Sequence, residues 1–139
     1  MNSLIFEKVD GYKGLIIGYI IVGAFFVACM VITYPRVIVS FPVSFTVGAD
    51  VKRVEFEVPF LHSWIKVEVF VSSGTALWAA KILSNDTALW SHTASQSGQT
   101  TYSSEWIKIS SGHYNFTITA VGIGSLEAEV RITSKGGLW

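Results

Sequence analysis

GLIIGYIIVGAFFVACMVITYPRVIVSFPV, residues 14–43, decides the fold, because it changes from an unbroken apolar run into stretches rich in Val, Ile and Phe around two prolines. From Leu15 to Thr33 there are nineteen residues without a charge. As an α-helix at about 1.5 Å per residue, this run is just under the roughly 30 Å hydrocarbon core of a bilayer. Soluble helices are apolar along one stripe, whereas this one is apolar all round. The sequence therefore predicts a membrane-spanning helix, which ends at Pro35 because proline has no backbone N–H.

The composition of the whole chain agrees with a membrane or cell-envelope protein. Half of the 139 residues are hydrophobic and 14% are charged, against about 25% in an average soluble protein. Basic and acidic residues cancel, and no basic run is longer than Lys52-Arg53, so we expect no nucleic-acid partner. Cys29 is the only cysteine, which excludes an intramolecular disulfide and a thiolate metal cluster.

The basic residues around the apolar run predict its orientation. Lys8 and Lys13 precede it, while Arg36 alone follows it closely, so the positive-inside rule favours a cytoplasmic N-terminus. The expected parts are a short cytoplasmic tail (1–14), a transmembrane helix (15–34) and an extracytoplasmic domain (35–139). Two acceptor sequons, at Asn85 and Asn115, agree with an external domain and are candidate glycosylation sites.

Beyond the span, the hydrophobic pattern alternates with a period of two. Runs at 36–47, 54–58, 64–69, 75–83, 87–92, 104–109, 113–121 and 125–133 are typical of half-buried strands. Gly74, Ser97-Gly98, Ser111-Gly112 and residues 122–125 supply turn chemistry between them. The sequence predicts about eight or nine strands, no second helix, and an Ig-like antiparallel β-sandwich.

The last two predicted strands have a well-defined alternation. If residues 121–125 form a hairpin loop, the core face pairs Ala120 with Leu126, Ile118 with Ala128, Phe116 with Val130 and Tyr114 with Ile132. A slip of one residue would exchange the two faces. The phrase SSGHYNFTITAVGIGSLEAEVRI resembles the closing hairpin of many Ig-like extracellular modules, a likeness that implies fold and not function.

The N-terminal segment carries a second, short resemblance. Lys13-Gly14-Leu15-Ile16, placed before an apolar helix, resembles the prepilin-peptidase site of archaeal pilins and archaellins. That likeness implies an archaeal cell-envelope protein and, as an alternative function, a pilin-like filament subunit processed after Gly14. Against it, the expected helix ends at Pro35, earlier than in a usual pilin.

No pattern in the chain predicts catalysis or a bound cofactor. His62, His92 and His113 are 30 and 21 residues apart, with no close pair to preform a metal site. No G-x-S-x-G nucleophile motif occurs. We therefore expect a protein that is not an enzyme, with no cofactor and no metal.

The tryptophans are the most informative side chains for function. Alternation places Trp64 and Trp106 on the outward side of their strands, with Ile65 and Ile107 turned inward. Exposed indoles are typical of protein interfaces, sugar platforms and lipid headgroup contacts, although a second layer of the domain would also cover them. We take Trp64 and Trp106 as interface candidates.

The main hypothesis is a noncatalytic, membrane-anchored envelope protein that acts as a structural or accessory subunit of a larger membrane or surface assembly. Its partners would be the lipid bilayer and other membrane or envelope subunits, with Gly18 and Gly23 as candidates for packing against another transmembrane helix. The alternatives are the pilin-like subunit, a small accessory subunit of a membrane oxidoreductase, and a carbohydrate-binding surface module.

Overall fold

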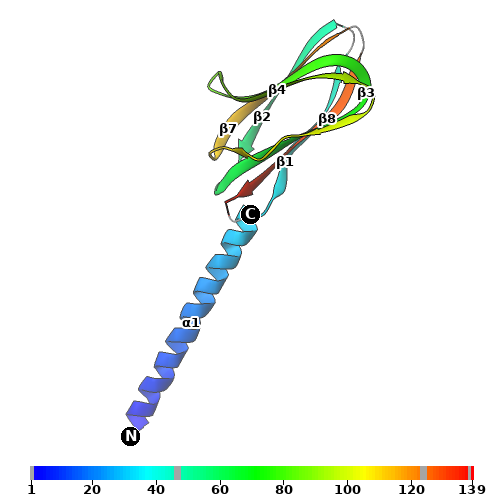
Figure 1. The fold of residues 1–139 in the computed structure, drawn as a ribbon. Coiled ribbons are helices and arrows are strands. Elements are labelled where there is room, and N and C mark those ends of the chain that lie inside the picture. The colour runs from blue at the N-terminus through cyan, green and yellow to red at the C-terminus, as the bar shows by residue number, and fades with distance from the viewer. Residues whose placement is uncertain (1, 46–47, 123–124, 138) are drawn as a thin grey trace.

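A computed structural model describes residues 2–45, 48–122, 125–137 and 139 of the chain. Its single described helix, α1 (Asn2–Thr33), is followed by a mostly β domain. The part of α1 from Tyr12 to Thr33 is long and apolar enough to cross a membrane, and its most apolar stretch is not buried against the rest of the protein, whereas Thr33 at its end is buried. Figure 1 shows α1 projecting from one end of the β domain as an isolated rod.

The helix ends where the sequence predicts. Its last residue is Thr33, whose hydroxyl donates to the carbonyl of Cys29 at 2.6 Å. Pro35 has no N–H to continue the ladder, and its ring disfavours helical backbone at Tyr34. The chain then enters the first strand at Arg36.

The β domain confirms the predicted sandwich. β3 runs through both of its antiparallel sheets, so that eight strands make nine strand segments. Sheet A contains β1, β8, the first half of β3, β5 and β6, and sheet B contains β2, β7, the second half of β3 and β4. The strands are β1 (Arg36–Phe45), β2 (Gly48–Val58), β3 (His62–Ser84), β4 (Thr87–Ser97), β5 (Thr100–Ser103), β6 (Ile107–Lys108), β7 (Gly112–Gly122) and β8 (Leu126–Gly136).

Gly74 is not the turn that the sequence predicts between two strands. It lies inside β3, at the point where this strand leaves β8 of sheet A and continues beside β7 of sheet B. Its φ is +132°, and a Cβ built on it would lie 2.2 Å from the backbone oxygen of Ser125. β3 is continuous through this bend, so the predicted strands at 64–69 and 75–83 are one strand. Glycine is the residue that fits the bend, because any side chain would meet the backbone of Ser125.

The predicted hairpin pairing of the last two strands is wrong. β7 pairs with β2 and β3, with Phe116 opposite Val54 and Ile82, whereas β8 pairs with β1 and β3, with Val130 opposite Phe41 and Val69. The chain therefore crosses from sheet B to sheet A between β7 and β8. Residues 123–124 of the predicted loop, like 46–47 of the predicted first strand, lie outside the described residues.

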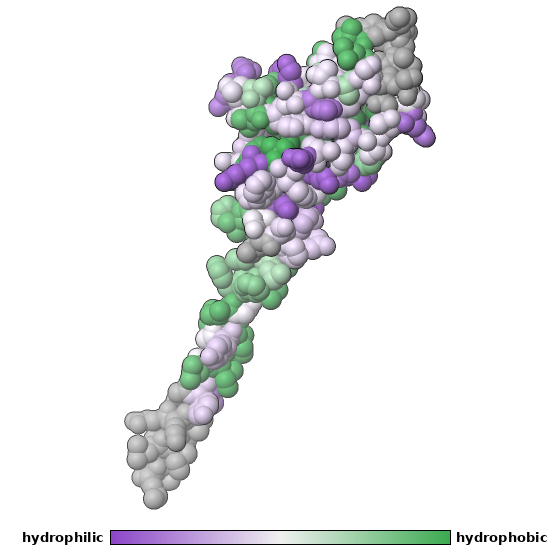
Figure 2. Space-filling model, viewed as in Figure 1, coloured by the Kyte–Doolittle hydropathy of each residue, from purple (hydrophilic) through white to green (hydrophobic). Residues whose placement is uncertain are grey.

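The predicted assignment of faces is nevertheless confirmed, because both strands turn their apolar side chains into one core. Phe116, Ile118, Ala128 and Val130 are all buried. Phe116 contacts Phe41 of the opposite sheet edge to face, with ring centroids 5.7 Å apart. Figure 2 shows the contrast in surface on this face of the molecule: hydrophobic side chains are frequent on the coloured part of the helix, and hydrophilic ones are frequent on the sandwich.

Candidate functional site

The outer face of sheet A carries a surface that combines tryptophan and lysine, near the end of the sandwich from which α1 emerges. Trp64 of β3 lies opposite Lys108 of β6 and Lys135 of β8. Trp106, between β5 and β6, has the ammonium of Lys135 at 4.3 Å and that of Lys66 at 5.8 Å from its ring centroid. We call these five residues the Trp–Lys surface: Trp64, Lys66, Trp106, Lys108 and Lys135.

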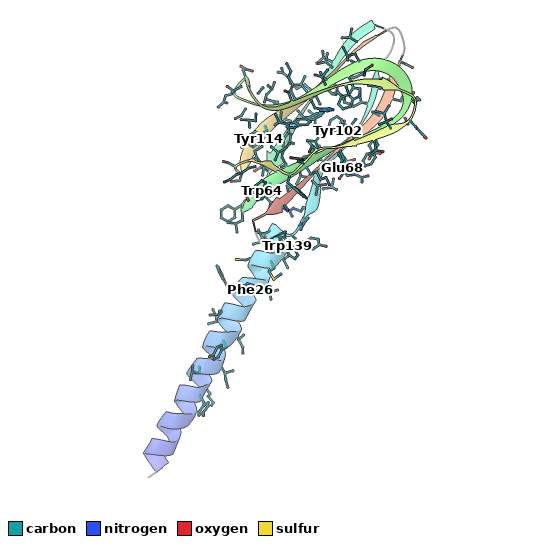
Figure 3. All side chains as sticks on the ribbon, viewed as in Figure 1. Phe26, Trp64, Glu68, Tyr102, Tyr114 and Trp139 are labelled. Atoms are coloured by element: carbon teal, nitrogen blue, oxygen red, sulfur yellow. The ribbon has the colours of Figure 1, made fainter. Side chains whose placement is uncertain are left out.

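Both predicted interface tryptophans thus lie on the outer face of the sandwich. Trp64 and Trp106 are half-buried, so each keeps part of its indole in contact with solvent. Ile65 is turned inward and fully buried, and Ile107 is half-buried against the core. Alternation placed Trp64 correctly on the outer side of β3. The predicted strand at 104–109 is wrong for Trp106, which lies in the segment between β5 and β6, and the role of both indoles in an interface stays a prediction. In Figure 3, Trp64 lies on the helix-proximal part of the sandwich.

The distal part of the same face is hollowed into an open groove of about 720 Å³. The ring of Phe70 lies in it, with the guanidinium carbon of Arg131 5.2 Å from its centroid. The carboxylate of Glu129 accepts a hydrogen bond from Ser40 at 3.0 Å and lies 3.5 Å from Arg131. Other residues along the groove are Pro42, Ser44, Ser72, Gln99, Thr100, Thr101 and Glu127. Sheet A is therefore basic near the helix and bears carboxylates at its distal end.

A cluster of aromatic rings closes the side of the sandwich between β4 and β5. His92 and Tyr102 stack with their ring centroids 3.8 Å apart, and Trp78 and Trp90 surround them. Burial, and then the charge of Glu105, raise the pKa of Tyr102 above its ordinary value. The sequence analysis missed this cluster, although Trp90 and His92 are two residues apart in a predicted strand and hence share a face. His92 and Trp90 therefore pack between the edges of the two sheets.

The junction of the helix and the sandwich is held by a buried histidine. His62 is 2% exposed, with its Nε2 2.5 Å from the carbonyl oxygen of Ile32 and its Nδ1 2.6 Å from the hydroxyl of Ser134. A carbonyl can only accept, so Nε2 carries the hydrogen, and in a neutral ring Nδ1 accepts from Ser134. Next to it, a Cβ on Gly136 would lie 2.4 Å from Cβ of Thr33, so the last turn of α1 rests directly on β8.

The titratable side chains form no evident metal or catalytic cluster in the described part of the chain. No group of three or more His, Cys, Asp and Glu side chains comes together there to hold a metal ion. His62 is in the junction, His92 is in the aromatic cluster, and His113 is exposed at the start of β7. That the protein lacks enzymatic activity remains an expectation.

The remaining predicted site residues lie apart from the Trp–Lys surface. A Cβ on Gly18 or Gly23 would meet nothing within 4 Å, so the rest of the protein covers neither glycine, and their packing against another helix stays a prediction. Asn85 is exposed in the turn between β3 and β4, with a φ of +48°. Asn115 is half-buried within β7, and its side-chain oxygen is buried without a hydrogen-bond partner. Asn85 is thus the more exposed of the two sequon residues, and glycosylation of either stays a prediction.

Comparison with known proteins gives a likeness of fold only. No family model and no curated protein matches the chain. Among solved structures, TmCBM61 in complex with β-1,4-galactotriose has a TM-score of 0.47 at 12% identity, covering 73% of this chain and 88% of its own. The carbohydrate-binding module CBM6cm-2 from Cellvibrio mixtus lichenase 5A, in complex with cellotriose, has a TM-score of 0.44 at 15% identity, covering 70% and 88%. A pilus protein of Bacillus endospore appendages has a TM-score of 0.40 at 12% identity, covering 74% and 89%. At these values the likeness carries no argument about what this chain binds.

Proposed function

We propose that the chain is a noncatalytic, single-pass membrane protein whose sandwich acts as a docking module outside the cell membrane, with the N-terminus in the cytoplasm. The observation that supports the anchor is that the most apolar stretch of the 22 residues Tyr12–Thr33 is not buried against any other part of the protein. Water is a poor solvent for so large an apolar surface, since each exposed methylene costs about 0.8 kcal/mol. A bilayer covers this surface on all sides.

Membrane extraction tests the anchor directly. Alkaline carbonate and high salt should leave the full chain in the membrane pellet, because a spanning helix holds far more firmly than a surface contact. A single cysteine in place of Leu77 on the sandwich, in a Cys29→Ser background, should react in intact cells with a reagent that does not cross membranes. Release of the intact chain by carbonate would contradict the anchor, and protection of residue 77 in intact cells with reaction after lysis would contradict the orientation.

The Trp–Lys surface is the part of the sandwich that we propose contacts other envelope subunits. Trp64 and Trp106 are half-buried, so they present rigid indole surface to a partner without needing to become ordered on binding. Lysines 66 and 135 flank Trp106 and add charge to an apolar centre. Tryptophan is enriched among interface hot spots, where truncation often costs about 2 kcal/mol or more.

Replacement of Trp64 and Trp106 by serine tests this surface. A Trp64→Ser, Trp106→Ser double variant should fold but should lose its homo-oligomer or its partner on purification in mild detergent. A loss of about 2 kcal/mol in binding free energy lowers the affinity about 30-fold. Leu77→Ser is the matched control, because Leu77 is 49% exposed and lies on sheet B. Equal association of the double variant and the control would show that the interface lies elsewhere.

A second candidate function is carbohydrate binding, and the groove beside Phe70 is the observation that favours it. The groove offers an aromatic ring together with hydroxyl, amide and carboxylate groups, the combination that sugar rings contact with their faces and edges. Titration of the purified chain with neutral oligosaccharides, with Phe70→Ala as the comparison, separates this function from protein docking.

The two other hypotheses remain proposals with their own tests. A pilin-like subunit requires cleavage after Gly14, which mass spectrometry of the native N-terminus detects. An oxidoreductase accessory subunit would co-purify with a catalytic subunit that carries a redox cofactor. An intact N-terminus with no such partner would leave the docking module as the better account.

A further inference from the structure

The end of the sandwich next to α1 exposes several large apolar side chains. Phe60 and Leu61, in the turn between β2 and β3, are 74% and 44% exposed, and Trp139 is 43% exposed. Tyr34 and Val37, just beyond the helix, are also exposed. We call these five residues the collar: Tyr34, Val37, Phe60, Leu61 and Trp139.

The turn that carries Phe60 and Leu61 keeps an unfavourable backbone conformation. The N–H of His62 donates to the carbonyl of Pro59 at 3.0 Å and closes the turn. Leu61 has a φ of +66°, which costs a residue with a side chain about 1 kcal/mol or more. Glycine or asparagine would relieve this strain, but either would remove an apolar side chain from the collar.

Contacts to the last turn of α1 fix the depth of the collar. His62, which follows Leu61, reaches the carbonyl of Ile32, and the indole N–H of Trp139 donates to the hydroxyl of Thr33 at 3.2 Å. The ring of Trp139 meets Tyr34 edge to face at 5.1 Å. The collar therefore lies at the level where the apolar helix ends, which is the level of the headgroups when the helix spans a bilayer.

Basic residues lie on sheet A at the level of the collar. In the strand register, Arg36 lies opposite Ser134, and Lys108 and Lys135 lie beside Trp64, within about two residues of the strand ends and hence about 7 Å from them. Glu57, opposite His113 on sheet B, is an acidic residue at a similar level. An apolar rim with cations among and beside its residues matches the boundary where acyl chains meet phosphates in a lipid leaflet.

We propose that the collar inserts into the boundary between acyl chains and headgroups, so that the sandwich rests on the lipid surface with its Trp–Lys surface held just above it. The occupant of the collar is the bilayer in which α1 is anchored, and this inference therefore rests on the membrane anchorage proposed above. Phe60 and Leu61 enter the lipid, and Trp139 and Tyr34 lie at the interface with their polar atoms toward water. Arg36 and Lys108 approach the phosphates.

The single native cysteine makes a site-specific test possible. In a Cys29→Ser background, the full chain carries one cysteine at residue 60, 77 or 22, labelled with a polarity-sensitive dye and reconstituted in phosphatidylcholine–phosphatidylglycerol vesicles. Bromine on the acyl chains reports contact with lipid, and aqueous iodide reports contact with water. Leu77 is the control on the sandwich, because it pairs with Val121 at the distal end, and Val22 is the control within the span.

The expected result is strong bromolipid quenching and weak iodide quenching at residues 22 and 60, and the reverse at residue 77. Quenching by bromolipid at 22, with residue 60 as accessible to iodide as residue 77, would overturn the collar and leave the anchor standing. Shielding of residue 60 from both quenchers would mean that protein, such as a second copy, covers it, and would also overturn the proposal. Absence of bromolipid quenching at residue 22 would overturn the anchorage itself.

Discussion

Replacement of Gly74 by alanine tests the bend that joins the two sheets. Alanine at this position would have to adopt a φ of +132°. Residues with a side chain avoid this region, because it costs them about 1–3 kcal/mol. The new methyl would also lie 2.2 Å from the oxygen of Ser125 and 2.7 Å from Cα of Leu126, both backbone atoms that cannot rotate away. Overpacking of this kind costs about 1–3 kcal/mol more. We expect Gly74→Ala to lower the free energy of unfolding by about 2–6 kcal/mol, the sum of the two costs.

Gly98→Ala is the matched control for this change. Gly98 also has a positive φ, +80°, but a Cβ on it would meet nothing within 4 Å, so only the backbone cost of about 1 kcal/mol applies. Both variants should be unfolded with urea as full chains in detergent, with tryptophan emission as the signal, because Trp78 is buried in the core and changes environment on unfolding. If the two variants differ by less than about 1 kcal/mol, the backbone of Ser125 and Leu126 does not lie against Gly74, and the bend described for β3 is wrong.

Two further predictions concern the core and the aromatic cluster. Phe116→Ala should cost about 3–5 kcal/mol in the same urea assay, since Phe116 is fully buried, whereas a loss below about 1 kcal/mol would refute its place in the core. The raised pKa of Tyr102 means that folding favours its neutral phenol, so its contribution to stability is complete below the ordinary tyrosine pKa and is lost as pH rises through the folded value. Alkaline unfolding should therefore be less steep in Tyr102→Phe, and identical pH profiles would argue against burial of the hydroxyl.

The sequence predicts the faces of the strands better than their partners. Alternation in residues 113–121 and 125–133 identifies the inward side chains, because every strand of a sandwich turns one face to the same core. The same alternation fits a hairpin within one sheet and an arch between two sheets equally well. The pairing of β7 and β8 could therefore not be read from periodicity, and the hairpin was the wrong choice.

Gly74 shows a second limit of sequence patterns. A glycine between two alternating runs is the usual sign of a turn, and here it marks a bend within one strand. What requires glycine is contact with Ser125, some fifty residues away in the chain, and no local pattern contains that information. By contrast, the end of α1 at Thr33 was predictable, because Pro35 acts on its immediate neighbours.

Some features of the candidate site could likewise be predicted from the sequence, and others could not. Parity placed Trp64 on the outer face of β3, but Trp106 lies between two strands, and the association of both with Lys135 depends on β8 lying beside β3, which no motif indicates. The structural role of His62 was equally hidden, since its partners Ile32 and Ser134 are 30 and 72 residues away.

Because Thr33 packs against Gly136, with His62 beside it, the sandwich would rotate together with the helix. β7 extends eleven residues from its helix-proximal end, which at about 3.3 Å per residue is about 36 Å. Transmembrane helices tilt by about 20° on average, and that rotation would carry the distal end of the sandwich sideways by about 12 Å. Since tilt responds to bilayer thickness, the groove at the distal end would sweep laterally whenever the membrane thins or thickens, while Thr33 stays near the pivot.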